Sequence, residues 1–186
     1  FHFYDEEDEI VLLKHLFNYI NNIKPDTVLA WNMAFDIPYI IQRIINLGYN
    51  PKDIMCHPDF RYKEVNYFID EKNKFNYEER NDFAKISSYS VYLDQMIHFA
   101  SRRKEQKAIE NYKLDYIGQI TCGVKKLDYS HITTKLAELP YKDYETFVFY
   151  NIMDTIVQYC IEFKVNDIDS AYNNVLLDNT RWSKIY

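Results

Sequence analysis

The sequence TVLAWNMAFDIPYI at residues 27–40 passes from a short apolar run into a helical pattern. Residues 27–31 form a continuous apolar run, which predicts a strand buried on both faces. We expect residues 32–35 to form a turn, and Pro38 fits the first turn of the helix that follows. Asp36 would then lie beyond the C-terminal end of a strand, where ligands commonly bind in open α/β sheets.

Apolar residues spaced by three and four positions predict helices on both sides of this strand. The first has its apolar stripe at residues 10–20, and the acidic residues Asp5 to Glu9 precede it, as is typical of a helix N-terminus. The second helix ends near Gly48. Further helices are predicted at residues 96–107, 112–120, 132–139 and 142–163, and a further strand at residues 86–93 that ends at Asp94.

Residues 61–81 have a different pattern, in which charged and aromatic side chains alternate around a polar segment at residues 70–73. This pattern predicts an inserted β-hairpin with aromatic residues near Tyr67 and Phe75 in its two arms. The composition is that of a globular domain, with 47% hydrophobic, 27% charged and 17% aromatic residues. The glycine-rich phosphate loop of dinucleotide-binding folds is absent, so the sequence predicts another kind of α/β fold, with more helix than strand.

The net charge of −6 disfavours a protein that coats nucleic acid non-specifically, but it permits an enzyme that meets phosphates through bound metal. Cys56, Cys122 and Cys160 form no CxxC pair, so neither a zinc ribbon nor a disulfide framework is expected, and a reducing intracellular compartment is favoured. No apolar run approaches the roughly 20 residues that span a bilayer. The chain opens with Phe1 and an acidic run instead of a basic one, so we expect neither a membrane protein nor a secreted one.

Two places combine a carboxylate with a setting that favours chemistry. For Asp36, the alternative to a functional role is a helix N-cap. Tyr150 and Asp154 are four residues apart on a predicted helix, so their side chains point the same way. This pair indicates a site where Asp154 holds a cation and Tyr150 positions a water molecule. The alternative is a partly buried tyrosine and a solvated aspartate on an ordinary amphipathic helix.

Taken together, NxxFD at residues 32–36 and YxxxD at residues 150–154 resemble the second and third motifs of the DEDD nucleases in their tyrosine-bearing form. The wider segments are similar to those of the family B DNA polymerases, and most similar to the phage-type branch. These segments are WNMAFDIPYI at residues 31–40, LD at 93–94, NYKLDYIG at 111–118 and YNIMD at 150–154. The resemblance extends from about Asp5 to Phe163.

The resemblance implies a 3′–5′ proofreading exonuclease domain with a ribonuclease H-like α/β fold. It also implies two divalent ions, Mg²⁺ or Mn²⁺, held by four carboxylates. By position, Asp36 and Asp154 would be metal ligands, and Tyr150 would orient the attacking water. Asn32 and Phe35 would shape the pocket around the terminal nucleotide. The implied partners are a single-stranded DNA 3′ end, the primer-template and the rest of the polymerase chain.

The chain departs from this family in its first motif, a DxE on the opening strand that supplies the other two carboxylates. Asp5 and Glu7 have the right spacing, but they open a helix and lie too close to Asp36, so a capping role fits them better. Two carboxylates carry too little negative charge to hold two Mg²⁺ ions against their hydration. We therefore expect little nuclease activity from this chain alone.

The expected organisation follows from this departure. Residues 1–166 would form a partial exonuclease domain that lacks the first motif and some N-terminal strands. Residues 167–186 would lead toward a polymerase domain that is not contained in the chain, as expected for a fragment of a longer polymerase or a product truncated upstream. Two alternatives stay open: a free-standing DEDD exoribonuclease, and an inert ribonuclease H-like scaffold that contacts DNA.

The remaining features each have a structural interpretation and a functional one. Arg102 to Lys104 with Lys107, and the pair Lys125 and Lys126, could steer a DNA strand or could be solvated. The aromatic residues of the hairpin could stack on bases or pack against the domain itself, and packing is preferred. Asp94 is not expected to be a metal ligand. The predicted location is intracellular, in the host cytoplasm if the chain is viral.

Overall fold

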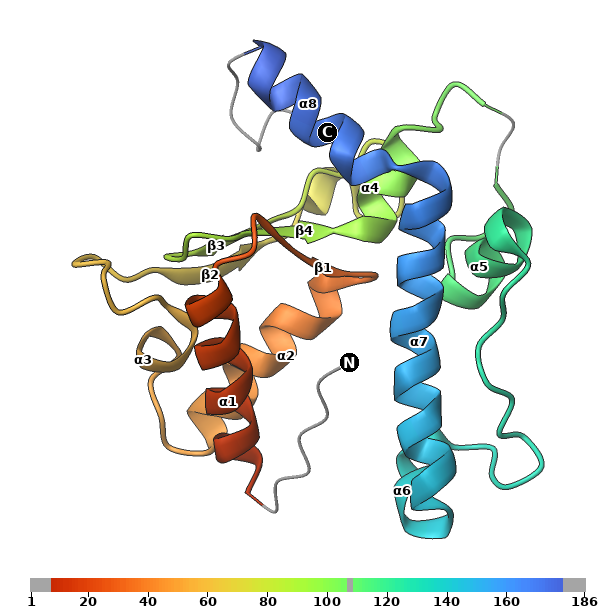
Figure 1. The fold of residues 1–186 in the computed structure, drawn as a ribbon, viewed down its shortest axis with the longest axis horizontal. Helices are drawn as coiled ribbons and strands as arrows, with labels where there is room; N and C mark the ends of the chain where they lie inside the picture. The colour runs from red at the N-terminus through yellow and green to blue at the C-terminus, as the bar shows by residue number, and fades with distance from the viewer. Residues whose placement is uncertain (1–7, 107–108, 179–186) are drawn as a thin grey trace. The chain divides into compact units, whose positions relative to one another are not determined.

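The computed structural model describes residues 8–106 and 109–178, which fall into two compact units divided after Lys104. In order along the chain, the first unit contains α1 Glu9–Ile23, β1 Thr27–Ala30, α2 Met33–Asn46, α3 Pro51–Met55, β2 Val65–Phe68, a 3₁₀ helix Glu71–Asn73, β3 Phe83–Ile86, β4 Val91–Asp94 and α4 Gln95–Ser101 (Figure 1). The second unit contains α5 Leu114–Cys122, a 3₁₀ helix Leu136–Glu138, α6 Leu139–Lys142, α7 Tyr144–Val165 and α8 Asp167–Asp178. The fold is mixed α/β, as the sequence predicts.

The strands form two small pairs in the first unit. β1 pairs in parallel with β4, and the register places Ala30 opposite Asp94 at the C-terminal ends of both strands. β2 pairs antiparallel with β3, with Val65 opposite Ile86, and β3 leads into β4 along the same stretch of chain (Figure 1). All four residues of β1 are partly buried, rather than fully buried as predicted.

The core of the first unit is built from α1, α2 and the strands. α1 buries the predicted stripe except for Leu16, which is exposed, and Asp8 caps the helix by accepting a hydrogen bond from the Ile10 backbone N–H at 3.1 Å. Asp5 and Glu7 lie outside the described residues. The buried apolar side chains of this core are Ile10, Leu13, Phe17, Ile20, Met33, Ile37, Ile44, Ile54, Met55, Cys56, Val65 and Tyr92.

The start of α2 differs from the prediction. The helix begins at Met33, so residues 32–35 do not form a separate turn, and Pro38 lies inside the helix rather than in its first turn. The Asn32 carbonyl already accepts hydrogen bonds from the Phe35 and Asp36 N–H groups, at 2.9 and 3.4 Å. Asp36 is therefore a residue of the first part of the helix and not its N-cap.

The predicted hairpin is wrong in its second arm. β2 contains Tyr67, but Phe75 lies after the 3₁₀ helix in a segment of turns, and the strand that pairs with β2 is β3. The segment between β2 and β3 is held by Asp82, which is 1% exposed. Its carboxylate accepts hydrogen bonds from the Asp70 backbone N–H at 2.8 Å and from the Arg80 guanidinium at 2.6 Å. The hydrogen bond from Asp70 to Asp82 closes this segment into a compact loop.

Other element boundaries also differ from those predicted. The single strand predicted at residues 86–93 is two strands, β3 and β4, separated by a serine-rich bend. α4 ends at Ser101, well before residue 107, and the helix predicted at residues 132–139 is a 3₁₀ helix followed by α6. Residues 167–178 form α8, because Ile168 and Ala171 are buried and the Ile168 N–H bonds to the Glu162 carboxylate at 2.8 Å.

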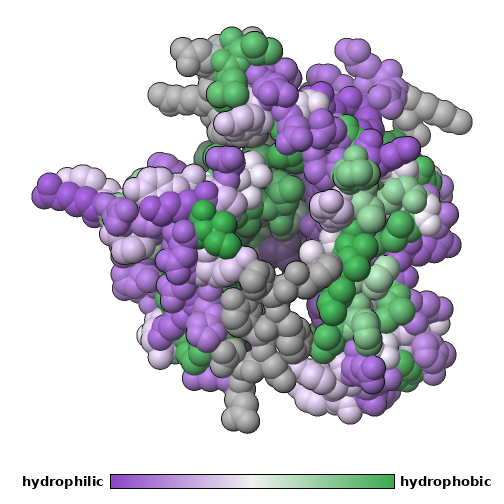
Figure 2. Space-filling view, viewed as in Figure 1, coloured by the Kyte–Doolittle hydropathy of each residue, from purple (hydrophilic) through white to green (hydrophobic). Residues whose placement is uncertain are grey.

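The second unit is organised by the long helix α7. α7 packs against α5, where Val157 lies against Gly118, and both Val157 and Ile161 are fully buried. α7 also exposes apolar side chains, including Phe149 and Phe163, and Figure 2 shows apolar surface along this helix. Among the described residues, no helix has both the length and the apolar character that a membrane span requires.

Candidate functional site

Asp36 is a half-buried carboxylate on the first part of α2. Burial raises the pKa of this carboxyl above its ordinary value. Within the described residues, no hydrogen bond or ion pair satisfies its oxygens. Phe35 beside it is 63% exposed, and its ring stacks on that of Tyr39 at a centroid distance of 5.7 Å. A half-buried carboxylate without a described partner is suited to binding a cation. The exposed aromatic surface beside it is suited to stacking a nucleobase.

The N-terminus of α2 is capped by a residue from another strand. Asn32 is the N-cap by position, but its exposed side chain makes no capping hydrogen bond. Instead, the buried Asp94 carboxylate accepts a hydrogen bond from the Met33 N–H at 2.8 Å. Burial raises the pKa of Asp94 to about 7, although the backbone N–H groups of Ile97, Met33 and Ala34 act in the opposite direction. Asp94 is thus occupied by backbone donors, and the expectation that it is not a metal ligand stays a prediction.

Tyr150 and Asp154 lie on one face of α7, in agreement with their four-residue spacing. The Lys126 ammonium group donates to both, at 2.7 Å to Asp154 Oδ2 and at 3.3 Å to the Tyr150 hydroxyl. Although burial lowers the pKa of Lys126, the hydrogen bond and charge of Asp154 raise it above its usual value. The Tyr150 ring also contacts Tyr129 edge-on, at a centroid distance of 5.3 Å. Asp154 is therefore not the solvated aspartate of the alternative interpretation.

The position of Lys126 is fixed by α5. The Asp115 carboxylate accepts a hydrogen bond from the Lys126 backbone N–H at 2.8 Å. The chain passes close to Gly118, whose carbonyl accepts from the Val124 N–H at 3.3 Å. The segment at residues 111–118 thereby holds the lysine that reaches Asp154. Sequence analysis predicts for Lys126 only DNA steering or a solvated position, because nothing in its neighbours indicates its partner on a helix 28 residues later.

The oxygen atoms of these residues fit a divalent cation. Asp154 Oδ1 is a buried oxygen with no hydrogen-bond partner among the described residues, while Oδ2 faces Lys126. Hard carboxylate oxygens are the ligands that Mg²⁺ and Mn²⁺ prefer. Within the described residues, however, no group of three or more His, Cys, Asp and Glu side chains is arranged to hold a metal. Asp36 belongs to the first unit and Asp154 to the second, so their meeting at one ion is part of the proposal below.

The basic residues that follow α4 have local partners, and so does the buried His57. The Arg103 guanidinium lies 3.7 Å from the centre of the Phe99 ring, and Lys104 pairs with Glu79 at 3.8 Å. Lys107 lies outside the described residues. His57, next to Cys56, is buried and its Nδ1 accepts a hydrogen bond from the Asp59 N–H at 3.2 Å, which leaves this nitrogen occupied. These contacts agree with structural roles.

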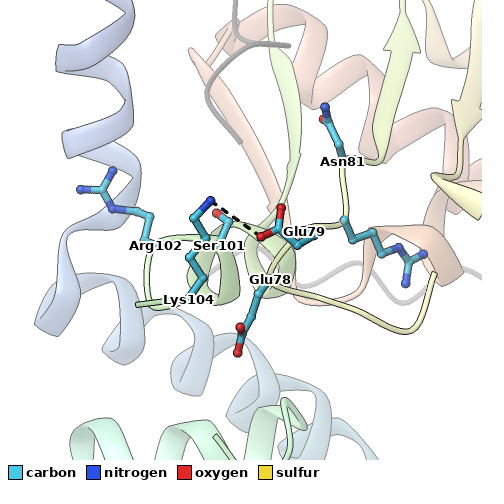
Figure 3. Close-up of a pocket in the computed structure, with 7 residues that line it drawn as sticks. Glu78, Glu79, Asn81, Ser101, Arg102 and Lys104 are labelled. Carbon is cyan, nitrogen blue, oxygen red and sulfur yellow. Dashed lines mark ion pairs between the residues drawn. The ribbon is translucent and has the colours of Figure 1, made fainter. Parts of the chain in front are cut away.

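A polar cavity of about 180 Å³ lies in the first unit, beside the C-terminal end of α4. Figure 3 shows the ion pair between Lys104 and Glu79 at this cavity, and the Glu78 carboxylate pointing in a different direction from that of Glu79. The two glutamates therefore do not form a carboxylate pair suited to a metal. The residues that line the cavity are Glu78, Glu79, Arg80, Asn81, Ser101, Arg102 and Lys104.

Comparison with known proteins identifies the family. The family model for the exonuclease domain of DNA polymerase family B matches residues 2–117, which includes Asn32, Phe35, Asp36 and Asp94. The DNA-directed DNA polymerase of Escherichia phage RB69 is 28% identical over 187 residues, and this alignment covers 98% of the chain, including Tyr150 and Asp154. The chain spans 18% of the length of that polymerase. The chain therefore belongs to the exonuclease domains of family B DNA polymerases.

Proposed function

We propose that this chain is the 3′–5′ exonuclease region of a DNA-directed DNA polymerase, which proofreads by hydrolysing the 3′-terminal phosphodiester bond of DNA. The match of residues 2–117 to the exonuclease domain of family B carries this proposal. Family membership implies a ribonuclease H-like fold, and the parallel pair of β1 and β4 beside α2 is compatible with it. The proposed partners are a single-stranded DNA 3′ end, the primer-template and the remainder of a polymerase chain.

In this proposal, Asp36 and Asp154 hold divalent ions, Mg²⁺ or Mn²⁺, at one site. When bound, two such ions activate a water molecule and stabilise the leaving 3′ oxygen. The support lies in the oxygens themselves: within residues 8–106 and 109–178, Asp154 Oδ1 is buried without a hydrogen-bond partner, and Asp36 is half-buried. A buried carboxylate without a partner is costly unless a cation compensates it.

The remaining residues would bind and orient the reactants. The Tyr150 hydroxyl accepts a hydrogen bond from Lys126, so its own proton is available to donate to the attacking water. That water would lose a proton to solvent as it forms the new bond to phosphorus, and the 3′ oxygen would take up a proton from solvent as its bond to phosphorus breaks. Exposed Phe35, stacked on Tyr39, offers an aromatic surface to the terminal base, and the exposed Asn32 amide is available for hydrogen bonding.

The Lys126 ammonium group has two consequences for this site. It neutralises part of the negative charge of Asp154, and it lies within reach of any phosphate oxygen bound beside that carboxylate. We also propose that the 186-residue chain is a weak nuclease by itself, because Asp36 and Asp154 are the only two of the four family carboxylates that it supplies. The proposed location is intracellular, and the similarity to a phage polymerase supports the host cytoplasm.

The test uses 5′-labelled single-stranded DNA with Mn²⁺, and it compares the chain with Asp36→Asn and Asp154→Asn. We expect slow shortening from the 3′ end, one nucleotide at a time, and its loss in both variants. A product pattern from internal cleavage, or equal rates in the variants, would contradict the proposed site. Rapid trimming would contradict the expected weakness of the chain, and a preference for RNA ends would favour an exoribonuclease. DNA binding with no Mn²⁺ uptake at all would favour the inert scaffold.

A further inference from the structure

The carboxylate of Asp94 holds the starts of two helices at once. Asp94 is the last residue of β4, and it is 1% exposed. Oδ1 accepts a hydrogen bond from the Ile97 N–H in the first turn of α4, at 3.1 Å. Oδ2 accepts a hydrogen bond from the Met33 N–H, at 2.8 Å, and the nearby Ala34 N–H acts to lower the pKa of this carboxyl. One buried side chain therefore satisfies donors at the N-termini of both α4 and α2.

α2 depends on this carboxylate because it has no cap of its own. Its N-cap residue, Asn32, makes no side-chain capping bond. Pro38 has no N–H, so the Ala34 carbonyl receives no helical hydrogen bond from it. The first turn of α2 is thus weakened from within, and its first N–H group is held by a residue that lies 61 positions later in the chain.

The sheet brings Asp94 to this position. β1 and β4 are parallel and in a register that sets Ala30 beside Asp94, so both strands end at the same level. The Trp31 carbonyl accepts a hydrogen bond from the Met96 N–H at 3.2 Å, which links the two strand-to-helix connections a second time. Asp94 therefore links the first turn of α2 directly to the C-terminal end of the β1–β4 pair.

We propose that Asp94 is a positioning residue, which fixes the first turn of α2 and thereby aims the Asp36 carboxylate. This inference rests on the proposed function, in which Asp36 is a metal ligand. Asp36 follows Met33 by three positions, so the two lie on the same side of the helix, and a rotation at Met33 turns Asp36 with it. The described residues give Asp36 no hydrogen-bond partner of its own, so its direction is set by the backbone of α2.

The decisive variants separate the two caps that Asp94 provides. Asp94→Asn keeps the shape and one acceptor, which can still cap α4, but its NH₂ group then faces the N–H groups of α2. Asp94→Ser is the second variant: serine is a good N-cap for α4, but its hydroxyl is too short to reach Met33 as well. Asp8→Ala is the matched control, because it removes a helix cap whose acceptor bonds to the Ile10 N–H of α1 and not to the first turn of α2.

Two readouts are combined: Mn²⁺ affinity, by electron paramagnetic resonance titration of the full chain, and amide hydrogen exchange at Met33 and Ala34. We expect Asp94→Asn and Asp94→Ser to weaken the Asp36-dependent binding about tenfold or more, as is common when a supporting partner of a metal ligand is removed. Exchange at Met33 should become faster. Asp8→Ala should leave Mn²⁺ affinity unchanged even though its melting temperature falls.

The outcomes distinguish this inference from the proposed function. If Asp36→Asn leaves Mn²⁺ binding unchanged, the role of Asp36 as a ligand is wrong. If Asp36→Asn weakens binding but both folded Asp94 variants bind Mn²⁺ as the parent chain does, the positioning role of Asp94 is overturned. A loss of affinity in Asp8→Ala equal to that in the Asp94 variants would also overturn it, because a general loss of stability would then explain the effect.

Discussion

At the scale of single residues, Asp154 has one carboxylate oxygen held by an ammonium group, and the other is buried with no hydrogen-bond partner in the part of the chain that the structure describes. Lys126 supplies that ammonium, and it also contacts the Tyr150 hydroxyl. The side chains of Lys126 and Asp154 are 26% and 27% exposed, so water screens their attraction in part. Their ion pair orders the site more than it stabilises the fold.

The first prediction concerns Lys126→Met, which keeps the aliphatic stem and removes the charge. We expect the free energy of unfolding to fall by about 1 kcal/mol or less, because the pair is partly exposed. The effect should shrink in high salt. Chemical denaturation measures it, and Lys125→Met is the control, since Lys125 is exposed in the same loop. An equal loss in both variants would show that the contact with Asp154 contributes nothing.

The second prediction concerns the pH dependence that Asp94 causes. Burial raises its pKa in the folded chain to about 7 from an ordinary value of 3.8, and the charge of Asp82, itself paired with Arg80, adds to this rise. The folded chain thus holds a proton that the unfolded chain releases. The stability contributed by this proton is fully present below about pH 4 and is lost as pH rises through about 7.

The measurement is the difference in unfolding free energy between the parent chain and Asp94→Asn, which cannot titrate. Relative to that of Asp94→Asn, the unfolding free energy of the parent chain should fall by up to roughly 4 kcal/mol between pH 4 and pH 8. Comparing the two chains removes the contributions of Asp36 and the other carboxyls, which both chains share. A difference that is flat across this range would contradict the account of Asp94 as a buried, titrating carboxyl.

Which residues the sequence predicts depends on how local their partners are. Asp36, Tyr150 and Asp154 stand out because their neighbours within a few residues form a pattern. Asp94 and Lys126 do not, because their partners, Met33 and Asp154, are distant in the chain and are brought near only by strand register and helix packing. A single sequence contains no signal for such contacts.

At the scale of secondary-structure elements, the packing of α5 on α7 depends on a glycine. A Cβ atom at Gly118 would lie 2.5 Å from Val157 Cγ1 and 2.8 Å from the Val124 carbonyl oxygen. We therefore predict that Gly118→Ala destabilises the chain by about 1–3 kcal/mol, even though alanine is the better helix former. The double variant with Val157→Ala should still be less stable than the parent chain, because the Val124 carbonyl oxygen remains too close to the new Cβ atom. A melting temperature of Gly118→Ala at or above that of the parent would contradict this packing.

The loop between β2 and β3 gives a fourth prediction. Asp82 and Arg80 form a buried ion pair, 1% and 7% exposed, and Asp82 also accepts from Tyr67 and Asp70. Asp82→Asn should cost about 3–5 kcal/mol, because it leaves the guanidinium buried without its counter-charge. Glu64→Gln, which breaks the exposed pair with Lys85, should cost less than about 1 kcal/mol. Urea unfolding of the two variants should separate these values clearly, and similar losses would contradict the account.

Elements with strong local periodicity are predictable from the sequence, and those set by long-range pairing are not. The stripes of α1 and α7 place these helices within a few residues of their observed bounds. The second arm of the predicted hairpin failed because alternation near Phe75 is outweighed by the Arg80–Asp82 pair and by the register of β2 with β3. α8 was missed because Ile168 and Ala171 are too few to mark an amphipathic stripe among polar neighbours.

At the scale of the whole molecule, the chain has two units, and the proposed site draws on both. The family match at residues 2–117 covers the first unit and reaches α5, whereas Tyr150 and Asp154 lie beyond it on α7. The alignment with the phage polymerase covers these two residues as well. The proposed function therefore requires that α2 and α7 present their carboxylates to the same ion.

Anomalous X-ray scattering from crystals of the chain soaked in Mn²⁺ tests this requirement most directly. We predict a manganese peak about 2.2 Å from carboxylate oxygens of both Asp36 and Asp154, with the Tyr150 hydroxyl facing it. Peaks that each involve only one of these two aspartates, or two aspartates separated by packed side chains, would contradict a shared nuclease site.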